Sequence, residues 1–184
     1  MGEAGRPGSG HPVGVRANGQ TREARSFWWD RETRTEADVL RAVIFDADTA
    51  LPDVEHDGPA TDLVDAVMSL FVAGIWVSVV STRPRAEVET QVRQLLGDGL
   101  VETIVTIDDL PEPDTALARS GELYRLALWE LGITPRAALA VTGSGCALRT
   151  SAAAGLPAVF VDNSLLSAAS CQQAHRRWWI RQAA

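Results

Sequence analysis

Two aspartates, Asp46 and Asp48, stand one residue apart at the end of a short apolar run. Carboxylates this close together at the end of a buried strand are costly unless a cation lies between them. Mg²⁺ is the cation that such oxygen ligands suit. Asp46 and Asp48 are therefore predicted to be metal ligands, and an acidic strand-to-loop turn without chemistry is the alternative reading.

The elements that must position these acids follow from the alternation of apolar runs and polar breaks. Compact apolar runs predict five strands, at 42–45, 75–80, 101–107, 137–141 and 158–161. Residues with helical spacing lie between them, at 60–73, 84–96, 121–131 and 147–154. This alternation is typical of βαβ units, so we expect an α/β fold with a five-stranded, mainly parallel sheet. Ligands of such sheets bind at the carboxyl ends of the strands, where Asp46 and Asp48 lie.

Segment 43–51, Val-Ile-Phe-Asp-Ala-Asp-Thr-Ala-Leu, resembles the first motif of the haloacid-dehalogenase (HAD) superfamily. The similarity covers about 41–163 and implies a three-layer Rossmann-like fold with phosphohydrolase chemistry. By this resemblance, Asp46 would be the nucleophile that takes up the phosphoryl group. Asp48 would be the general acid/base for the leaving group and water, with Mg²⁺ as the cofactor.

Two later segments support the resemblance. Residues 77–82, which end in Ser81-Thr82, resemble the second motif, in which a hydroxyl hydrogen-bonds the transferred phosphate. Ser81 and Thr82 are therefore predicted to bind phosphate, although a hydroxyl at a strand end is also a common helix cap. Residues 139–161 resemble the fourth-motif region of phosphoglucomutase-like members.

The chain departs from the family's pattern at two positions. The metal-binding aspartate of the fourth motif aligns with Gly143, so Asp162 or Asp108 would have to substitute for it. The lysine of the third motif aligns with Ala118, and all 17 basic residues of the chain are arginines. Arg119 is the candidate replacement as a phosphate ligand, but its planar guanidinium is not equivalent to an ammonium group. A solvated arginine at a helix start is the other reading.

These departures bear on activity. Loss of one preorganised electrostatic group typically costs about 10²–10³ in rate, so weak or lost phosphatase activity is expected. The alternative is a non-catalytic HAD-like module that binds a ligand or a protein, and a flavodoxin-like receiver is a more distant third. About 30 residues separate Asp48 from Ser81, and the expected helix at 60–73 takes up nearly half of them. No large cap domain is therefore expected, which suits a large phosphorylated substrate or a partner that covers the site.

The two ends of the chain differ from its middle. Residues 1–25, rich in Gly, Pro and Arg, predict a disordered tail before a HAD-like domain at 26–163 and a C-terminal helix at 164–184. Arginines flank two tryptophans at 176–181, which predicts packing of this helix on the domain or, alternatively, a protein-partner surface.

The segment 143–145 and the residue after it, Cys146, each allow two readings. The sequence Gly-Ser-Gly at 143–145 predicts either a phosphate cradle at a helix start or a tight turn. Cys146 follows it, and a small buried residue is the favoured reading over a nucleophile.

Composition narrows the function classes. A net charge of −7 and a pI near 4.9 argue against a nucleic-acid binder, which needs a positive field. No apolar run approaches the roughly 20 residues that span a bilayer, and the first residues lack the apolar stretch of a secretory signal. We therefore expect no membrane partner and a cytoplasmic location. The two cysteines are not in zinc-like spacing, and His11, His56 and His175 are scattered.

Overall fold

The computed structural model describes residues 39–52, 61–111, 116–161 and 166–183. Its centre is a five-stranded sheet in the order β3-β2-β1-β4-β5, in which every neighbouring pair is parallel. The strands are β1 (Ala42–Asp46), β2 (Trp76–Ser81), β3 (Thr103–Thr106), β4 (Ala138–Thr142) and β5 (Ala158–Phe160). The expected α/β fold with a five-stranded parallel sheet is confirmed.

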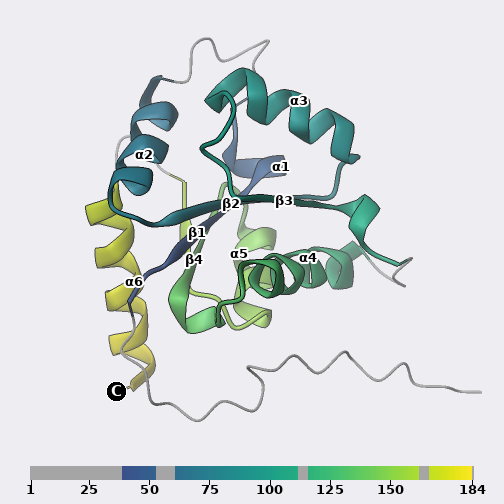
Figure 1. Ribbon diagram of the computed structural model, residues 1–184. Coiled ribbons are helices and arrows are strands. Elements are labelled where there is room, and N and C mark those ends of the chain that lie inside the picture. Colours follow the sequence, from purple (N-terminus) through teal and green to yellow (C-terminus); the bar gives the residue numbers. More distant parts are fainter. Residues whose placement is uncertain (1–38, 53–60, 112–115, 162–165, 184) are drawn as a thin grey trace, which may run out of the picture.

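Helices cover both faces of this sheet (Figure 1). They are α1 (Ala47–Ala50), α2 (Thr61–Val72), α3 (Arg85–Leu96), α4 (Ala116–Leu131), α5 (Gly145–Ala153) and α6 (Ala168–Ala183). Helices α2 and α3 pack on one face, α4 and α5 pack on the other, and α6 contacts α2 and β4. The result is a three-layer arrangement with the carboxyl ends of the strands at one edge.

Alternate residues of the central strand explain the two cores. Val43 and Phe45 of β1 belong to the cluster on the α2–α3 face, which also includes Cys171 of α6. Ala42 and Ile44 belong to the cluster on the α4–α5 face. All four β1 side chains are essentially inaccessible to solvent, as expected for a strand covered on both sides. Because β1 is clamped in this way, the residues that follow it leave the sheet at a fixed place.

Several element boundaries differ from those expected. The third strand is shorter than the predicted 101–107, because the Asp109 carboxylate accepts a hydrogen bond from the Thr106 backbone N–H at 2.8 Å and turns the chain into a 3₁₀ helix at Ile107–Asp109. Helix α4 begins five residues earlier than the predicted 121. Helix α1 was not expected, and it forms directly after β1 because Asp46 caps it.

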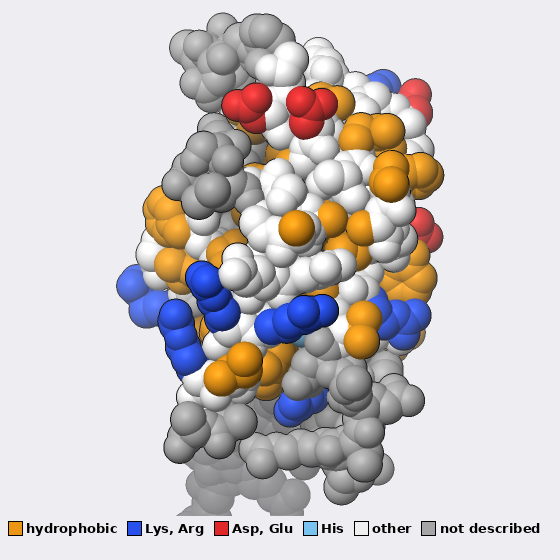
Figure 2. Space-filling view, turned by 90° about the vertical axis from the view of Figure 1, so that its left-hand side faces the viewer, with side chains coloured by type: hydrophobic (Ala, Val, Ile, Leu, Met, Phe, Trp, Pro, Cys, Tyr) orange, Lys and Arg blue, Asp and Glu red, His pale blue; other side chains and the backbone are white. Residues whose placement is uncertain are grey.

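The C-terminal helix α6 packs on the domain through one face. The Trp179 ring lies 4.4 Å from the Arg136 guanidinium, and its indole N–H donates to His175 Nε2 at 3.1 Å. The opposite face exposes arginines, namely Arg176, Arg177 and Arg181, and Figure 2 shows arginines gathered low on this side of the molecule. Trp179 thus packs against Arg136 and His175, and a protein partner at this helix stays a prediction. The predicted tail at 1–25, together with Trp28 and Trp29, lies outside them.

None of the helices in the described part of the chain is both long and apolar enough to cross a bilayer.

Candidate active site

Asp46 is the last residue of β1, and the residue is only 8% exposed. Its Oδ1 atom accepts a hydrogen bond from the backbone N–H of Asp48 at 3.1 Å. Its Oδ2 atom accepts from the hydroxyl of Thr49 at 2.8 Å and, more weakly, from that of Thr142 at 3.4 Å. The protein itself therefore supplies three donors to the carboxylate that the resemblance assigns as nucleophile.

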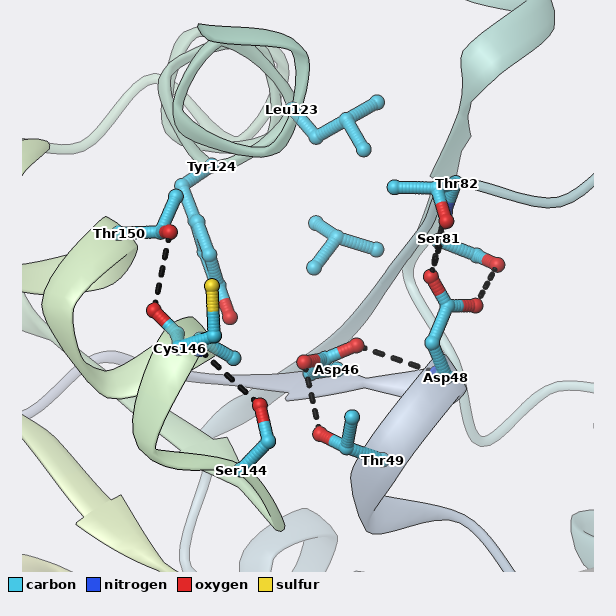
Figure 3. Close-up of a pocket in the computed structure, with 12 residues that line it drawn as sticks. Asp46, Asp48, Thr49, Ser81, Thr82, Leu123, Tyr124, Ser144, Cys146 and Thr150 are labelled. Carbon is cyan, nitrogen blue, oxygen red and sulfur yellow. Dashed lines mark hydrogen bonds between the residues drawn. The ribbon is translucent and has the colours of Figure 1, made fainter. Parts of the chain in front are cut away.

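Asp48 lies in the first turn of α1 and turns toward the end of β2. Its Oδ1 atom accepts from the Ser81 hydroxyl and from Arg83 Nε–H, the latter at 3.2 Å. Its Oδ2 atom accepts from the backbone N–H of Thr82 at 2.8 Å and from the Thr82 hydroxyl at 2.6 Å. Four donors thus hold a side chain that is 23% exposed. Ser81 and Thr82, the predicted phosphate ligands, contact Asp48 (Figure 3).

These surroundings shift the pKa values of the two carboxyl groups in opposite directions. Burial raises the pKa of Asp46 above its usual value, and the charge of Asp48 adds to this effect, although the hydrogen bonds from Thr49 and Asp48 act against it. Burial also acts to raise the pKa of Asp48, but the hydrogen bonds from Ser81, Thr82 and Arg83 outweigh it and hold that pKa below its usual value. The lowered pKa of Asp48 favours its charged form, whereas the general acid implied by the resemblance must carry a proton.

Gly143, which the resemblance aligns with the family's metal-binding aspartate, makes a close approach to α1. Its backbone N–H donates to the Thr49 hydroxyl at 2.9 Å. A Cβ atom on Gly143 would lie 1.9 Å from the Thr49 carbonyl oxygen, far inside the contact distance of two such atoms. No side chain fits here without a backbone shift. The α1 backbone therefore occupies the place into which an aspartate side chain at position 143, just after β4, would extend.

The donor set that the described residues provide does not fit a Mg²⁺ ion. Mg²⁺ requires near-octahedral oxygen ligands, and the described residues contain no group of three His, Cys, Asp or Glu side chains that would hold a metal. Both oxygens of Asp48 are already used by Ser81, Thr82 and Arg83. Gly143 cannot contribute a carboxylate.

A pocket of about 150 Å³ opens beside these two acids. Hydroxyl, thiol and apolar side chains complete its lining, namely Thr49, Val80, Ser81, Thr82, Leu123, Tyr124, Ser144, Cys146, Ala147 and Thr150. None of these described lining residues is basic. Figure 3 shows the Tyr124 hydroxyl pointing from α4 toward the side of the pocket where Asp46 lies. That hydroxyl is buried and has no hydrogen-bond partner among the described residues.

The remaining predicted residues do not extend this site. Asp108 accepts a hydrogen bond from the Arg85 backbone N–H at 2.8 Å, so it caps the start of α3 and is not among the described residues that line the pocket. Asp162 lies outside the described residues, as does the side chain of Arg119, whose backbone is in the first turn of α4. Whether Arg119 binds phosphate stays a prediction.

The structure decides between the alternative readings of Ser144 and of Cys146. Ser144 caps α5, and its hydroxyl oxygen accepts from the Ala147 backbone N–H at 3.1 Å, which favours a turn and cap over a phosphate cradle. Cys146 is a free thiol that is exposed and lines the pocket, so the expectation that it is buried is wrong. The reason is its position in the first turn of α5, at the open edge of the sheet. His175 is buried against Arg136, while His11 and His56 lie outside the described residues.

Four contributors to the site escaped the sequence analysis: Thr49, Arg83, Tyr124 and Thr142. Arg83 carried a usable signal, because it follows the second motif directly and a cation at a strand end faces the same edge as Asp48. Thr142 ends β4 and could have been predicted as a site residue by the same argument. Thr49 and Tyr124 gave no such signal, because their roles depend on contacts between distant elements.

No protein-family model matches the sequence, and no curated protein sequence matches it. Solved structures do. The chain is similar to β-phosphoglucomutase from Clostridium difficile, with a TM-score of 0.61 and 10% identity over 78% of this chain and 100% of that one. It is also similar to the CbbY protein of Rhodobacter sphaeroides in complex with phosphate, with a TM-score of 0.54 and 18% identity over 66% of this chain and 86% of that one.

A third likeness is to an L-2-haloacid dehalogenase, with a TM-score of 0.54 and 14% identity over 67% of this chain and 87% of that one. Identities this low establish the architecture and not the activity. The parallel sheet, the strand-end acids and these three likenesses agree with one another. The chain has the haloacid-dehalogenase-like fold that its first motif predicted.

Proposed function

We propose that this chain is a phosphohydrolase-type HAD protein that has lost Mg²⁺-dependent hydrolysis of phosphate monoesters and retains its pocket as a binding site. One observation carries the proposal: the Thr49 carbonyl oxygen lies where a side chain on Gly143 would begin. The loss of the fourth-motif acid is therefore built into the backbone around α1. Removal of one preorganised electrostatic group typically costs about 10²–10³ in rate.

The hydrogen bonds of Asp48 support the same proposal. Ser81 and Thr82 would have to release this carboxylate before they could bind a phosphoryl oxygen. Arg83 would have to give up its ion pair with Asp48 at 3.2 Å to balance charge on a phosphate. In each case a contact within the protein is lost when a contact with the phosphate forms. The net free energy of phosphate binding therefore gains little from these residues.

The catalytic alternative is favoured by the placement of Asp46 on the pocket wall beside Thr49 and Ser81. In that reaction an oxygen of Asp46 would bond to phosphorus while the ester P–O bond breaks, and Asp48 would give a proton to the departing oxygen. Water would then give a proton to Asp48 and attack the phosphoaspartate, which releases inorganic phosphate and restores both Asp46 and Asp48. Mg²⁺ would supply charge neutralisation for the phosphoryl group.

Hydrolysis of p-nitrophenyl phosphate with and without Mg²⁺ separates the two functions. We expect the wild-type chain and Asp46→Asn to show the same background rate, with no dependence on Mg²⁺. An exposed-acid control, Asp98→Asn, checks that preparations are comparable. Mg²⁺-dependent turnover that disappears in Asp46→Asn would establish the catalytic alternative.

The openness of the site supports a partner or a ligand that enters from solvent. Helix α2 belongs to the layer that covers the sheet, and only α3 lies between β2 and β3, so the described segments after the first two motifs form no lid. The proposal includes an uncapped pocket. It also includes a reducing, cytoplasmic location, and the two cysteines of the chain, both free thiols, support that location. A protein partner at the exposed arginines of α6 is a further part of it.

A further inference from the structure

The pocket combines two acids with a polar group that has no partner in the part of the chain that the structure describes. Asp48 has Arg83 as its counter-ion, whereas Asp46 forms no ion pair with any described residue. The described lining residues include no basic side chain. A buried charge is costly unless a group of opposite charge pairs with it. The side of the pocket next to Asp46 therefore favours a positively charged occupant.

The Tyr124 hydroxyl is an independent sign of a ligand at the same place. Tyr124 is 2% exposed, lines the pocket and has no hydrogen-bond partner for its hydroxyl among the described residues. Burial raises the pKa of this phenol, and the charges of Asp46 and Asp48 raise it further, so the group stays neutral. A buried hydroxyl without a partner costs roughly 1–3 kcal/mol, and a ligand placed between it and Asp46 would satisfy it.

We propose that the pocket binds a small primary ammonium group, with Asp46 as its counter-ion and the Tyr124 oxygen as a hydrogen-bond acceptor. The inference deepens the proposed function, because it names a ligand class for the same pocket. An ammonium group carries three N–H donors and no acceptor, which matches a site that offers a carboxylate and a phenol oxygen. The apolar side chains of Val80, Leu123 and Ala147 line the pocket beside them and suit a short alkyl chain.

Other occupants match these groups less well. A phosphate dianion would face Asp46 and Asp48 with no described basic residue in the lining. Mg²⁺ would find too few free carboxylate oxygens, since Asp48 is held by Ser81, Thr82 and Arg83. A neutral alcohol would satisfy Tyr124 but would leave the Asp46 charge unpaired.

The two cysteines of the chain provide the test. Cys146 lines the pocket and is exposed, whereas Cys171 is buried and serves as an internal control. We expect propylammonium chloride to slow alkylation of Cys146 by iodoacetamide in a saturable way, while tetramethylammonium chloride and 1-propanol at equal concentration do not. The first control carries the charge without N–H donors, and the second carries a donor without charge.

Substitutions assign the effect to the two predicted contacts. Tyr124→Phe removes the buried hydroxyl without creating a cavity, and we expect propylammonium to bind it about tenfold more weakly. Asp46→Asn should weaken binding by more than about tenfold, because it removes the counter-ion. In Asp98→Asn, propylammonium should protect Cys146 from alkylation as it does in the wild type. Circular dichroism confirms that each variant is folded before the comparison.

The proposal is overturned if protection is absent, if it is equal with tetramethylammonium, or if it persists in Asp46→Asn. Protection by inorganic phosphate in place of propylammonium would also overturn it, and would direct attention to Arg119. These results are distinct from failure of the proposed function, which is decided by p-nitrophenyl phosphate hydrolysis. A chain that neither hydrolyses phosphate nor binds propylammonium would retain the proposed loss of activity and lose only this inference.

Discussion

The two sides of the pocket differ in how their polar groups are satisfied. On the β1–β2 side, both oxygens of Asp48 accept two hydrogen bonds each from Ser81, Thr82 and Arg83. On the α4–β4 side, Tyr124 has a hydroxyl without a described partner, and Gly143 brings no side chain. The first side is therefore complete without a ligand, and the second is not. The difference agrees with the proposals that the protein's own donors hold Asp48 and that a ligand occupies the side next to Tyr124.

The largest expected effect lies where α1 meets β4. Gly143→Ala places a methyl group 1.9 Å from the Thr49 carbonyl oxygen. We expect the free energy of unfolding to fall by roughly 2–3 kcal/mol, because the backbone of α1 must move. Urea or thermal denaturation followed by circular dichroism measures this change.

Gly121→Ala is the matched control. Its new methyl group would have Thr150 Cγ2 as its nearest neighbour, at 3.9 Å, and Gly121 lies inside α4. Helix propensity predicts a gain of about 0.5–1 kcal/mol. If both glycine variants changed stability equally, the close approach of Thr49 to Gly143 would not explain the missing aspartate.

Asp48→Asn sharpens the comparison on the complete side of the pocket. An amide has one acceptor oxygen, so one pair of donors among Ser81, Thr82 and Arg83 would face an NH₂ group. We expect a loss of roughly 1–2 kcal/mol near neutral pH. Asp98→Asn, an exposed acid paired with Arg93, should change stability by less than about 0.5 kcal/mol.

The pH dependence of this effect follows from the lowered pKa of Asp48. A carboxyl group with a lowered pKa stabilises the fold at pH values above its ordinary pKa of 3.8. This stabilisation is lost as the pH falls through the folded-state pKa. The difference between wild type and Asp48→Asn should therefore be constant from pH 5 to pH 8 and shrink in stronger acid. A difference that grows on acidification would contradict the assignment.

Asp46→Asn should give a smaller effect of opposite sign. Burial and the nearby Asp48 charge raise the pKa of Asp46, so its charged form destabilises the fold above that pKa. We expect the substitution to stabilise the chain at neutral pH by less than Asp48→Asn destabilises it. As the pH falls through the raised pKa, wild-type Asp46 becomes neutral and the advantage of asparagine should disappear. Parallel melting curves at pH 7 and pH 4 test this sign.

Much of the fold was predictable because it rests on local patterns. The apolar run before Asp46 and the helical spacing that follows it identify a parallel sheet whose strand ends meet at one edge. That rule also brought Asp46, Asp48 and Ser81 together correctly. The first-motif resemblance then identified the HAD-like fold, which the solved structures confirm.

The details that decide the chemistry were not predictable from the sequence. The direction in which Asp48 turns depends on Arg83 and Thr82, which compete with any ligand for its oxygens. The Thr49 carbonyl meets Gly143 only because α1 packs against the end of β4. The expected start of α4 at Gly121 was too late, although Thr115, a residue type that commonly caps helices, stands directly before Ala116 in the sequence. Contacts of this kind depend on the tertiary packing of distant segments.

Calorimetric titration of the chain with Mg²⁺ tests the central claim most directly, since that claim is that protein donors have replaced a metal at Asp46 and Asp48. We predict no saturable heat at millimolar Mg²⁺, and identical traces for the wild type and Asp46→Asn. Saturable Mg²⁺ binding by the wild type that is absent in Asp46→Asn would contradict the account.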